Sequence, residues 1–223
     1  MYCYVDWDGG PMSCMHITVF GATGRTGVPL VEQALAGGHD VTAFVRDRSA
    51  LAIDHDALAV VEGDAYTGEG VERAVADADA VCSVLGQTRS GPDDLQTVAG
   101  RHILTAMAAA GVERFVTLTG AGVRDDDEQV TLSGKAMGLA LKLFAKSVLE
   151  DARTHIADVR ESDTDWTVVR GPRLTEGEHT GEYRHGALSL GMQAKISRAD
   201  VADFVLQVVE DGSYVHEMPL VSY

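Results

Sequence analysis

The stretch HITVFGATGRTGVP, residues 16–29, decides the fold class of this chain. Apolar and β-branched residues run directly into Gly21, Gly24 and Gly27, and a helix-compatible sequence follows. A strand that turns sharply into a helix presents free backbone N–H groups and a positive dipole end to an anion. Gly21 would allow the turn, Gly24 the close approach of a pyrophosphate, and Gly27 close packing of the helix on the sheet. This context predicts a dinucleotide-binding loop, with a purely structural tight turn as the alternative.

Strand-like and helix-like segments alternate beyond this loop. The residue pattern predicts strands at 17–20, 40–45, 58–61, 80–85, 115–118 and 166–169. It predicts helices at 26–36, 70–76, 93–110 and 135–160. Short buried strands that alternate with helices are typical of a parallel sheet with helices on both faces. We therefore expect an α/β, Rossmann-type, doubly wound parallel sheet in a single domain.

The pattern changes after Arg170. A Gly-rich loop comes first, then a possible short hairpin near 183–196, a helix at 199–209 and a last strand near 219–221. Ser197 and Asp200 form a capping-box pattern that opens this helix. We expect this third of the chain to form a small C-terminal cover over the sheet, so that residues 15–223 make one NAD(P)-binding domain. Residues 1–14 contain no basic region followed by an apolar core, and we interpret them as a loose N-terminal extension.

Charge and hydropathy exclude several partner classes. The formal net charge is −16, which disfavours nucleic acid because phosphate binding needs a basic surface. Acidic residues are dispersed and lysine is scarce, which suits a salt-adapted, halophilic source; an unusually acidic mesophilic protein is the alternative. No apolar run approaches the ~20 residues of a membrane helix, so no membrane partner is expected.

The three cysteines, Cys3, Cys14 and Cys82, form neither a CxxC pair nor a metal-ligand spacing. No metal site is therefore predicted. Cys82 lies within an apolar strand pattern and is expected in the core. A reduced, cytoplasmic compartment is the simplest interpretation.

The end of the second predicted strand bears on the choice of cofactor. An acid usually stands there in sites that prefer NAD, where it holds the ribose 2′-hydroxyl, whereas a basic residue suits a 2′-phosphate. Here Arg46 occupies that place, and Arg25 lies in the glycine loop. Two guanidinium groups can bind a phosphate through charge-assisted hydrogen bonds, so we favour NADP(H) over NAD(H). The alternative is that Arg46 and Arg48 are solvated surface charges and Asp47 binds the ribose.

Four segments together resemble a known family. They are GATGRTG at 21–27, VRD at 45–47, GDAY at 63–66 and ISRADVADFVLQVV at 196–209. The chain resembles the atypical short-chain dehydrogenases/reductases, within the NAD(P)H-binding group that includes NmrA-like proteins and biliverdin-IXβ reductase/flavin reductase. The resemblance extends from Met15 to Tyr223.

The resemblance implies a role for each strand end. The residues that it places around the pyrophosphate and the adenosine phosphate are Gly21, Ala22, Thr23, Gly24, Arg25, Thr26 and Gly27. Arg46 would contact the 2′-phosphate, and Asp64 and Ala65 would border the adenine. The ribose would lie beside Leu85, Gly86 and Gln87. The nicotinamide would be surrounded by Thr119, Gly120, Pro172, Arg173 and Leu174.

The chain also departs from the family in its catalytic residues. No tyrosine is followed by lysine four residues later, so the usual acid of alcohol oxidation and sugar epimerisation is missing. Flavin reductase-like relatives lack this pair too, but they commonly carry serine and histidine where this chain has Gly120 and Arg173, which disfavours a tetrapyrrole substrate. The remaining candidate catalytic residues are Thr119 and Arg173. Thr119 could orient the nicotinamide amide or a substrate carbonyl, or could simply bond the local backbone; Arg173 could hold an anionic substrate or the cofactor phosphates.

Together these features predict hydride transfer from NADPH to a small flavin-like or quinone-like acceptor, because such an acceptor takes its proton from water and needs no tyrosine. Flavin is thus a possible substrate, and a monomer or weak homodimer is expected. A non-catalytic NmrA-like redox sensor is the alternative, and a sugar-nucleotide epimerase-like enzyme is a weaker one. His179 and His185 flank the Gly-rich loop over the expected site, either as substrate-binding or as loop histidines.

Overall fold

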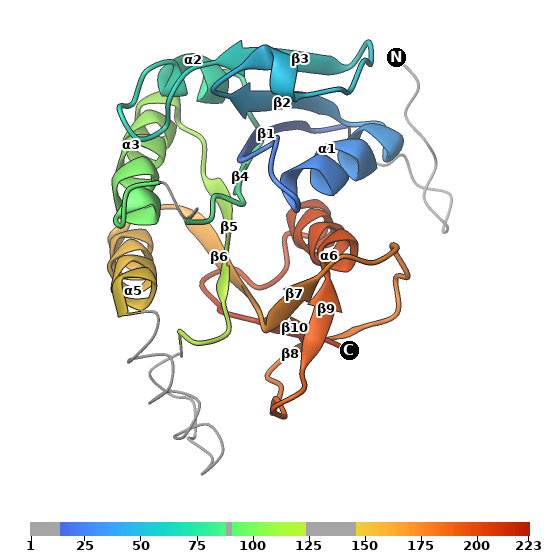
Figure 1. Cartoon of the computed structure of the whole chain (residues 1–223). Coiled ribbons are helices and arrows are strands. Elements are labelled where there is room, and N and C mark those ends of the chain that lie inside the picture. The colour runs from blue at the N-terminus through green and yellow to red at the C-terminus, as the bar shows by residue number, and fades with distance from the viewer. Residues whose placement is uncertain (1–13, 88–90, 124–145) are drawn as a thin grey trace.

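An eight-stranded sheet runs through the molecule in the order β3-β2-β1-β4-β5-β6-β10-β8 (Figure 1). The computed structural model describes residues 14–87, 91–123 and 146–223. Neighbouring strands from β3 to β10 pair in parallel, and β8 pairs antiparallel with β10. The order β3-β2-β1-β4-β5-β6 is that of a doubly wound Rossmann sheet, so the predicted fold class is confirmed.

The elements have the following bounds. The strands are β1 His16–Phe20, β2 Asp40–Val45, β3 Leu58–Glu62, β4 Ala80–Ser83, β5 Arg114–Gly120, β6 Asp165–Gly171, β7 Arg173–Thr175, β8 Arg184–Gly186, β9 Lys195–Ser197 and β10 Leu220–Ser222. The helices are α1 Gly27–Ala36, α2 Val71–Val75, α3 Leu95–Ala110, α5 Lys146–Glu161 and α6 Arg198–Glu210, with a 3₁₀ turn at Arg48–Ala50.

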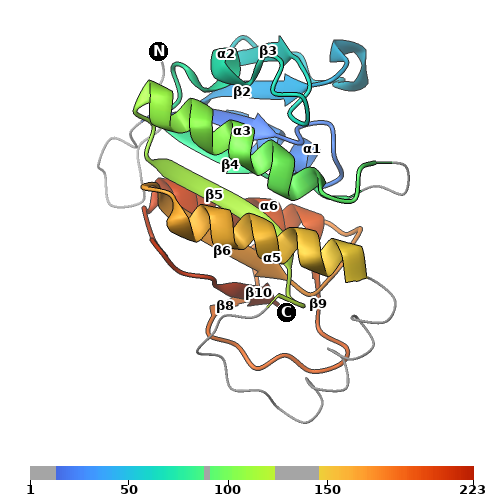
Figure 2. The ribbon, with the colours of Figure 1, turned by 90° about the vertical axis from the view of Figure 1, so that its left-hand side faces the viewer.

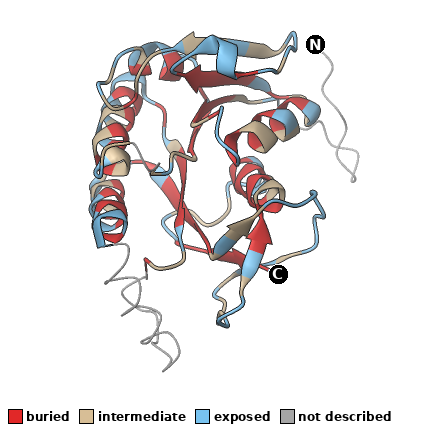
Figure 3. Ribbon diagram, viewed as in Figure 1, coloured by how far each residue is buried: buried red, intermediate tan, exposed pale blue. Residues whose placement is uncertain are grey.

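Two helical layers bury the two faces of the sheet. One apolar core lies under α1 and α6, and the other lies under α2, α3 and α5. Figure 2 shows α3 and α5 side by side across the face that is turned to the viewer. Successive residues of β1 alternate between the cores: Val19 belongs to the first and Phe20 to the second. Both faces are therefore buried, as the central red strands in Figure 3 show.

One prediction about the C-terminal third is corrected by the structure. The hairpin near 183–196 was wrong, because β8 pairs with β10 and β9 pairs in parallel with β7. One edge of β10 pairs with β6, and its other edge is free to pair with β8, so β8 joins the main sheet. The short strand β7 was not predicted.

The predicted helix at 135–160 begins at Lys146 among the described residues; positions 135–145 lie outside them.

The capping box is formed only in part. Ser197 accepts a hydrogen bond from the N–H of Asp200 at 3.0 Å, as predicted for the start of α6. The carboxylate of Asp200 does not return to the N–H of Ser197, which donates instead to the hydroxyl of Tyr223. Tyr223 in turn donates to Asp200, so a tyrosine hydroxyl completes the cap.

His155 is a buried imidazole between α5, α3 and β5. Its ring is 2% exposed and its Nε2 lies 3.1 Å from the hydroxyl of Thr117. Gly100 leaves the room for this ring, because a Cβ there would overlap Nδ1 and lie 2.6 Å from Cε1. Nδ1 has no hydrogen-bond partner among the described residues. Burial therefore lowers the pKa of His155 to about 4.

This low pKa predicts an acid-sensitive stability. Between pH 6.5 and pH 4 the unfolded chain binds a proton at His155 that the folded protein does not bind, so the free energy of unfolding falls as the pH falls. The contribution is at most about 3 kcal/mol. Urea unfolding at pH 7.5 and pH 4.5 measures it, and His155→Gln should reduce the difference between the two. If His155→Gln loses as much stability between pH 7.5 and pH 4.5 as wild type does, groups other than His155 cause the acid sensitivity.

Among the described residues, no helix is both long enough and apolar enough to span a membrane.

Candidate active site

The expected site lies at the edge of the sheet where the parallel strands end. Helix connections leave this edge in opposite directions at β1 and β4, which are neighbours in the sheet. In doubly wound sheets ligands bind at such a switch point. Gly21 marks it, since a Cβ there would lie 3.1 Å from the carbonyl of Val84. The glycine loop therefore packs directly against the segment that follows β4.

The glycine loop is built too tightly for side chains. Gly21 has a φ of +85°, a conformation that suits glycine. A Cβ at Gly27 would overlap the carbonyl oxygen of Gly21 and lie 2.8 Å from the Cα of Ala22. A Cβ at Gly24 would lie 2.9 Å from the same oxygen, and the N–H of Gly24 donates to it at 2.8 Å. The three glycines thus bring the start of α1 against the end of β1.

The start of α1 is left open for an anion. Its N-cap residue Thr26 makes no side-chain capping hydrogen bond, and the first turn holds no acid. Within the described part of the chain, no hydrogen bond is found for the N–H groups of Ala22, Thr23, Arg25 and Thr26. Unpaired N–H groups at a helix N-terminus fit the pyrophosphate of a dinucleotide.

The segment after β2 places basic and acidic side chains differently. Arg46 is exposed, and no side-chain contact is described for it among the residues of the structure. One oxygen of Asp47 accepts hydrogen bonds from the N–H and the hydroxyl of Ser49, at 2.8 and 2.7 Å. These bonds lower the pKa of Asp47. Asp47 therefore caps the 3₁₀ turn, while Arg46 remains free to bind a ligand.

The segments after β3 and β4 are fixed by local contacts. Asp64 accepts the N–H of Tyr66 at 2.9 Å, and the carbonyl of buried Ala65 lies 3.0 Å from Nδ1 of His102. Gln96, on α3, donates to the carbonyl of Leu85 at 2.9 Å. Hydrogen bonds therefore hold the segments that are predicted to border the adenine and the ribose.

Asp151 connects α5 to this region and was not predicted. It is 5% exposed, and its carboxylate accepts the N–H groups of Gln96 and Thr97 at 3.0 and 2.9 Å. It also accepts the side-chain amide of Gln87 at 3.2 Å. A carboxylate of α5 thus caps the N-terminus of α3 and fixes Gln87, whereas Gly86 is exposed.

The residues expected around the nicotinamide lie at the ends of β5 and β6. Thr119 is buried opposite Arg170 in the ladder, and exposed Gly120 lies opposite Gly171. Pro172 is half-buried and connects β6 to β7, in which Arg173 is exposed. Leu174 packs against the core under α6. Of these, exposed Gly120 and Arg173 are the more accessible to a ligand, and the cofactor and catalytic roles remain predictions.

Two further residues near the glycine loop were missed at the level of sequence. Glu176 follows β7, and its Oε1 accepts a hydrogen bond from Arg25 at 3.1 Å and one from Arg198 at 2.7 Å. Arg25 and Glu176 are 151 residues apart along the chain, so no local pattern relates them. Arg198 lies within the SRAD pattern, which suggested only a helix start.

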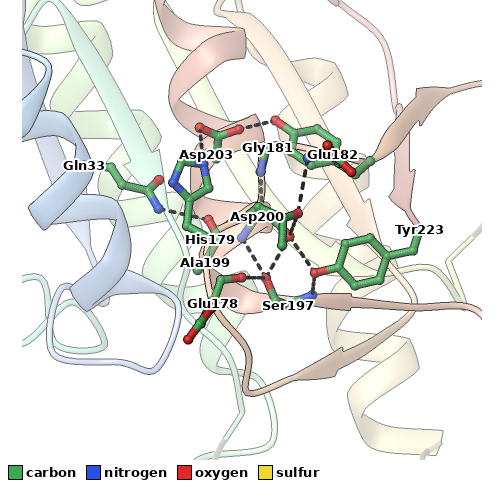
Figure 4. Close-up of polar contacts among 12 residues, drawn as sticks. Gln33, Glu178, His179, Gly181, Glu182, Ser197, Ala199, Asp200, Asp203 and Tyr223 are labelled. Atoms are coloured by element: carbon green, nitrogen blue, oxygen red, sulfur yellow. Dashed lines mark hydrogen bonds and ion pairs between the residues drawn. The ribbon is translucent and has the colours of Figure 1, made fainter.

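The loop between β7 and β8 is held on α6 by two carboxylates (Figure 4). Asp200 accepts the N–H groups of Thr180 and Gly181 at 2.7 and 3.0 Å, besides the hydroxyl of Tyr223. Burial alone would raise its pKa, but these hydrogen bonds outweigh burial and lower the pKa of Asp200 to about 2. Oδ1 of Asp203 lies 3.0 Å from Nε2 of His179. This contact with α6 gives His179 a role in holding the loop.

Tyr183 and His185 have structural partners as well. The hydroxyl of Tyr183 donates a hydrogen bond to Asp203. Burial and this bond raise the pKa of Tyr183, which makes it a poor general acid for catalysis. The ring of His185 stacks on Phe204, and its Nδ1 lies 2.7 Å from the hydroxyl of Tyr214. The contacts thus favour a structural role for both: His179 is a loop histidine, and His185 lies in β8, opposite Val221 of β10.

The comparison with known families agrees with this geometry. A family model described as NAD(P)H-binding matches residues 21–212, from the first glycine of the loop to just beyond the end of α6. The chain belongs to the NAD(P)H-binding family. This is an oxidoreductase family.

Relatives in the NAD(P)H-binding family include proteins with and without a known reaction. An uncharacterized protein of Bacillus subtilis, YwnB, is 28% identical over 213 residues, covering 91% of this chain and 96% of that protein. The 3-diazoavenalumate denitrifying reductase of a Streptomyces species is 32% identical over 200 residues, covering 81% of this chain and 62% of the reductase.

A solved structure shows the same fold. The short-chain dehydrogenase/reductase of Veillonella parvula in complex with NADP has a TM-score of 0.78 and 18% sequence identity, with 95% of each chain covered. The NAD(P)H-binding chain described here thus shares its arrangement of strands and helices with a known dinucleotide-binding fold.

Proposed function

We propose that this protein is an NADPH-dependent reductase that transfers hydride to a small flavin-like or quinone-like acceptor. The observation that carries the proposal is the end of β2, where Arg46 is exposed and Asp47 is engaged by Ser49. This arrangement favours a 2′-phosphate over a bare ribose hydroxyl, because a guanidinium binds phosphate through charge-assisted hydrogen bonds. The NADP bound by the Veillonella relative and the reductase activity named for the Streptomyces relative support it.

The proposed chemistry asks little of the protein beyond positioning. A bound NADPH supplies the hydride, and the acceptor takes its proton from water, so no Tyr-x-x-x-Lys pair is needed. The glycine loop and the start of α1 would bind the pyrophosphate. Arg46 would bind the 2′-phosphate. Gly120 and Arg173 would line the acceptor side, and buried Thr119 would orient the nicotinamide amide or a substrate carbonyl through its hydroxyl.

Arg46→Ala tests the cofactor preference. We expect wild type to bind NADPH more tightly than NADH, and the variant to lose about 10- to 100-fold in NADPH affinity with little change for NADH, because a charge-assisted bond to phosphate is lost. Titration calorimetry measures both affinities. Arg48→Ala, which removes a nearby exposed charge, is the matched control and should leave the preference intact. Equal losses in both variants would indicate only a general charge effect.

FMN-dependent oxidation of NADPH tests turnover. Oxidation by wild type, reduced in Arg46→Ala at subsaturating NADPH, is the expected result. Dinucleotide binding without oxidation of NADPH by FMN or a quinone would contradict the reductase and favour the redox sensor. Both assays should be run at low and high salt, because the chain carries a net charge of −16 that repels an anionic cofactor at low ionic strength.

A further inference from the structure

A single carboxylate holds two guanidinium groups beside the glycine loop. Oε1 of Glu176 accepts one hydrogen bond from Nη1 of Arg25 and another from Nη1 of Arg198. Arg25 belongs to the loop between β1 and α1, Arg198 is the first residue of α6, and Glu176 follows β7. Three segments that are far apart in the sequence thus bring two guanidinium groups to one carboxylate oxygen. This oxygen lies beside the loop that leads into α1.

The three side chains differ in how far they are buried, and therefore in how freely they can move. The side chain of Arg198 is only 14% exposed, so its charge needs an anionic partner. The side chains of Glu176 and Arg25 are 67% and 73% exposed. The carboxylate of Glu176 can therefore rotate into solvent and remain hydrated, whereas the guanidinium of Arg198 cannot. When Glu176 turns away, the two guanidinium groups present the donor arrangement that a phosphate oxygen accepts.

The backbone around these residues is anchored on both sides. Thr175 pairs with Ser197 in the β7–β9 ladder, and Ser197 donates to the carbonyl of Glu178 at 3.2 Å. Gln33 of α1 donates to the carbonyl of Ala199 at 3.0 Å, which ties the start of α6 to α1 (Figure 4). The exchange between carboxylate and phosphate therefore needs a change in the Glu176 side chain and no movement of the loop.

We propose that Arg198 is a phosphate-binding residue of the dinucleotide site, and that Glu176 competes with the cofactor pyrophosphate for Arg25 and Arg198. Glu176 thereby weakens dinucleotide binding and leaves both arginines paired when no cofactor is bound. This inference rests on the proposed dinucleotide-binding function. Since the pyrophosphate is common to both cofactors, Glu176 acts equally on NADPH and NADH, in contrast to Arg46.

Glu176→Gln removes the competing charge and keeps the size of the side chain. We expect it to bind NADPH and NADH about three- to tenfold more tightly than wild type, because the cofactor no longer displaces a carboxylate from Arg25 and Arg198. Glu178→Gln is the matched control, because it removes an equal charge from an exposed position on the same loop. It should change neither affinity by more than about twofold, because the described contacts of Arg25 and Arg198 are with Glu176 and an exposed charge is screened by salt.

Arg198→Gln and Arg198→Lys test the other half of the proposal. We expect Arg198→Gln to weaken the binding of both cofactors by about fivefold or more and Arg198→Lys to restore part of it. In Arg198→Gln the gain from Glu176→Gln should shrink, which a double-mutant cycle measures independently of any effect on folding.

The outcomes separate this inference from the function on which it rests. Binding by wild type with no gain, or with a loss, in Glu176→Gln overturns the competition and leaves the proposed function standing. A gain of the same size in Glu178→Gln overturns it as well. Failure of wild type and Glu176→Gln alike to bind either dinucleotide overturns the proposed function and this inference with it.

Discussion

Gly27→Ala is expected to destabilise the protein by about 2–4 kcal/mol and to lower the melting temperature by about 5–15 °C. Alanine is the better helix former, so at an unhindered helical position this change would stabilise by up to about 1 kcal/mol. Here the new Cβ overlaps the carbonyl oxygen of Gly21 and lies 2.8 Å from the Cα of Ala22. Both neighbours are backbone atoms, so relief requires α1 to move away from the end of β1.

The expected loss has a clear control and a second readout. Gly191→Ala adds the same methyl group where no atom lies within 4 Å, and it should leave the melting temperature nearly unchanged. Moving α1 also separates its N-terminus from the glycine loop, so Gly27→Ala should weaken NADPH binding even at temperatures where it is folded. Wild-type stability in Gly27→Ala, measured by thermal unfolding, would show that α1 does not pack on the loop as described.

Asp151→Ala is expected to cost about 2–4 kcal/mol of unfolding free energy, because it removes a helix cap and a buried charged acceptor together. The N–H groups of Gln96 and Thr97 would lose their acceptor at the start of α3, and the side-chain amide of Gln87 would lose its hydrogen bond to Asp151. Urea unfolding followed by circular dichroism measures the loss. Asp151→Asn should cost less, about 1–2 kcal/mol, since one carboxamide oxygen can still accept.

Asp158→Ala on the same helix is the matched control for Asp151. Its carboxylate pairs with the exposed side chain of Arg101 at 2.8 Å, and such surface pairs contribute little to the free energy of unfolding. The two variants remove the same group from α5 and differ in what that group bonds. Equal losses would mean that the removal of an acid from α5, and not the cap of α3, determines the effect.

The sheet could be predicted from sequence because its central strands carry their own signal. β1 and β2 are apolar runs bounded by glycine or polar turns, and both are buried on two faces. β7, β8 and β9 are each three residues long, which is too short for a periodic pattern to distinguish them from loop. Their pairing is decided by which edges the rest of the fold leaves free, and that information is not local.

In the candidate site, too, features that depend on neighbouring residues were predicted, and features that depend on distant residues were not. The glycine loop was predictable because the contacts that set its conformation are made within residues 21–27. Asp151, Glu176 and Arg198 were not, because each acts on a partner brought near only by the finished fold. Thr97 and Asp151 are 54 residues apart, for example, whereas Asp94 at the N-cap position of α3 makes no side-chain capping bond. The pKa of His155 likewise depends on α3, through Gly100.

The cap of α6 by Tyr223 has a consequence for synthesis on the ribosome. The glycine loop and β1 to β4 can pair as soon as they leave the exit tunnel, because their partners are near in the chain. The start of α6 and the loop held by Asp200 gain their last hydrogen bonds only once Tyr223 has emerged. A nascent chain would therefore form its glycine loop early, whereas the C-terminal segment that carries Glu176 would fold only after β10 has been synthesised.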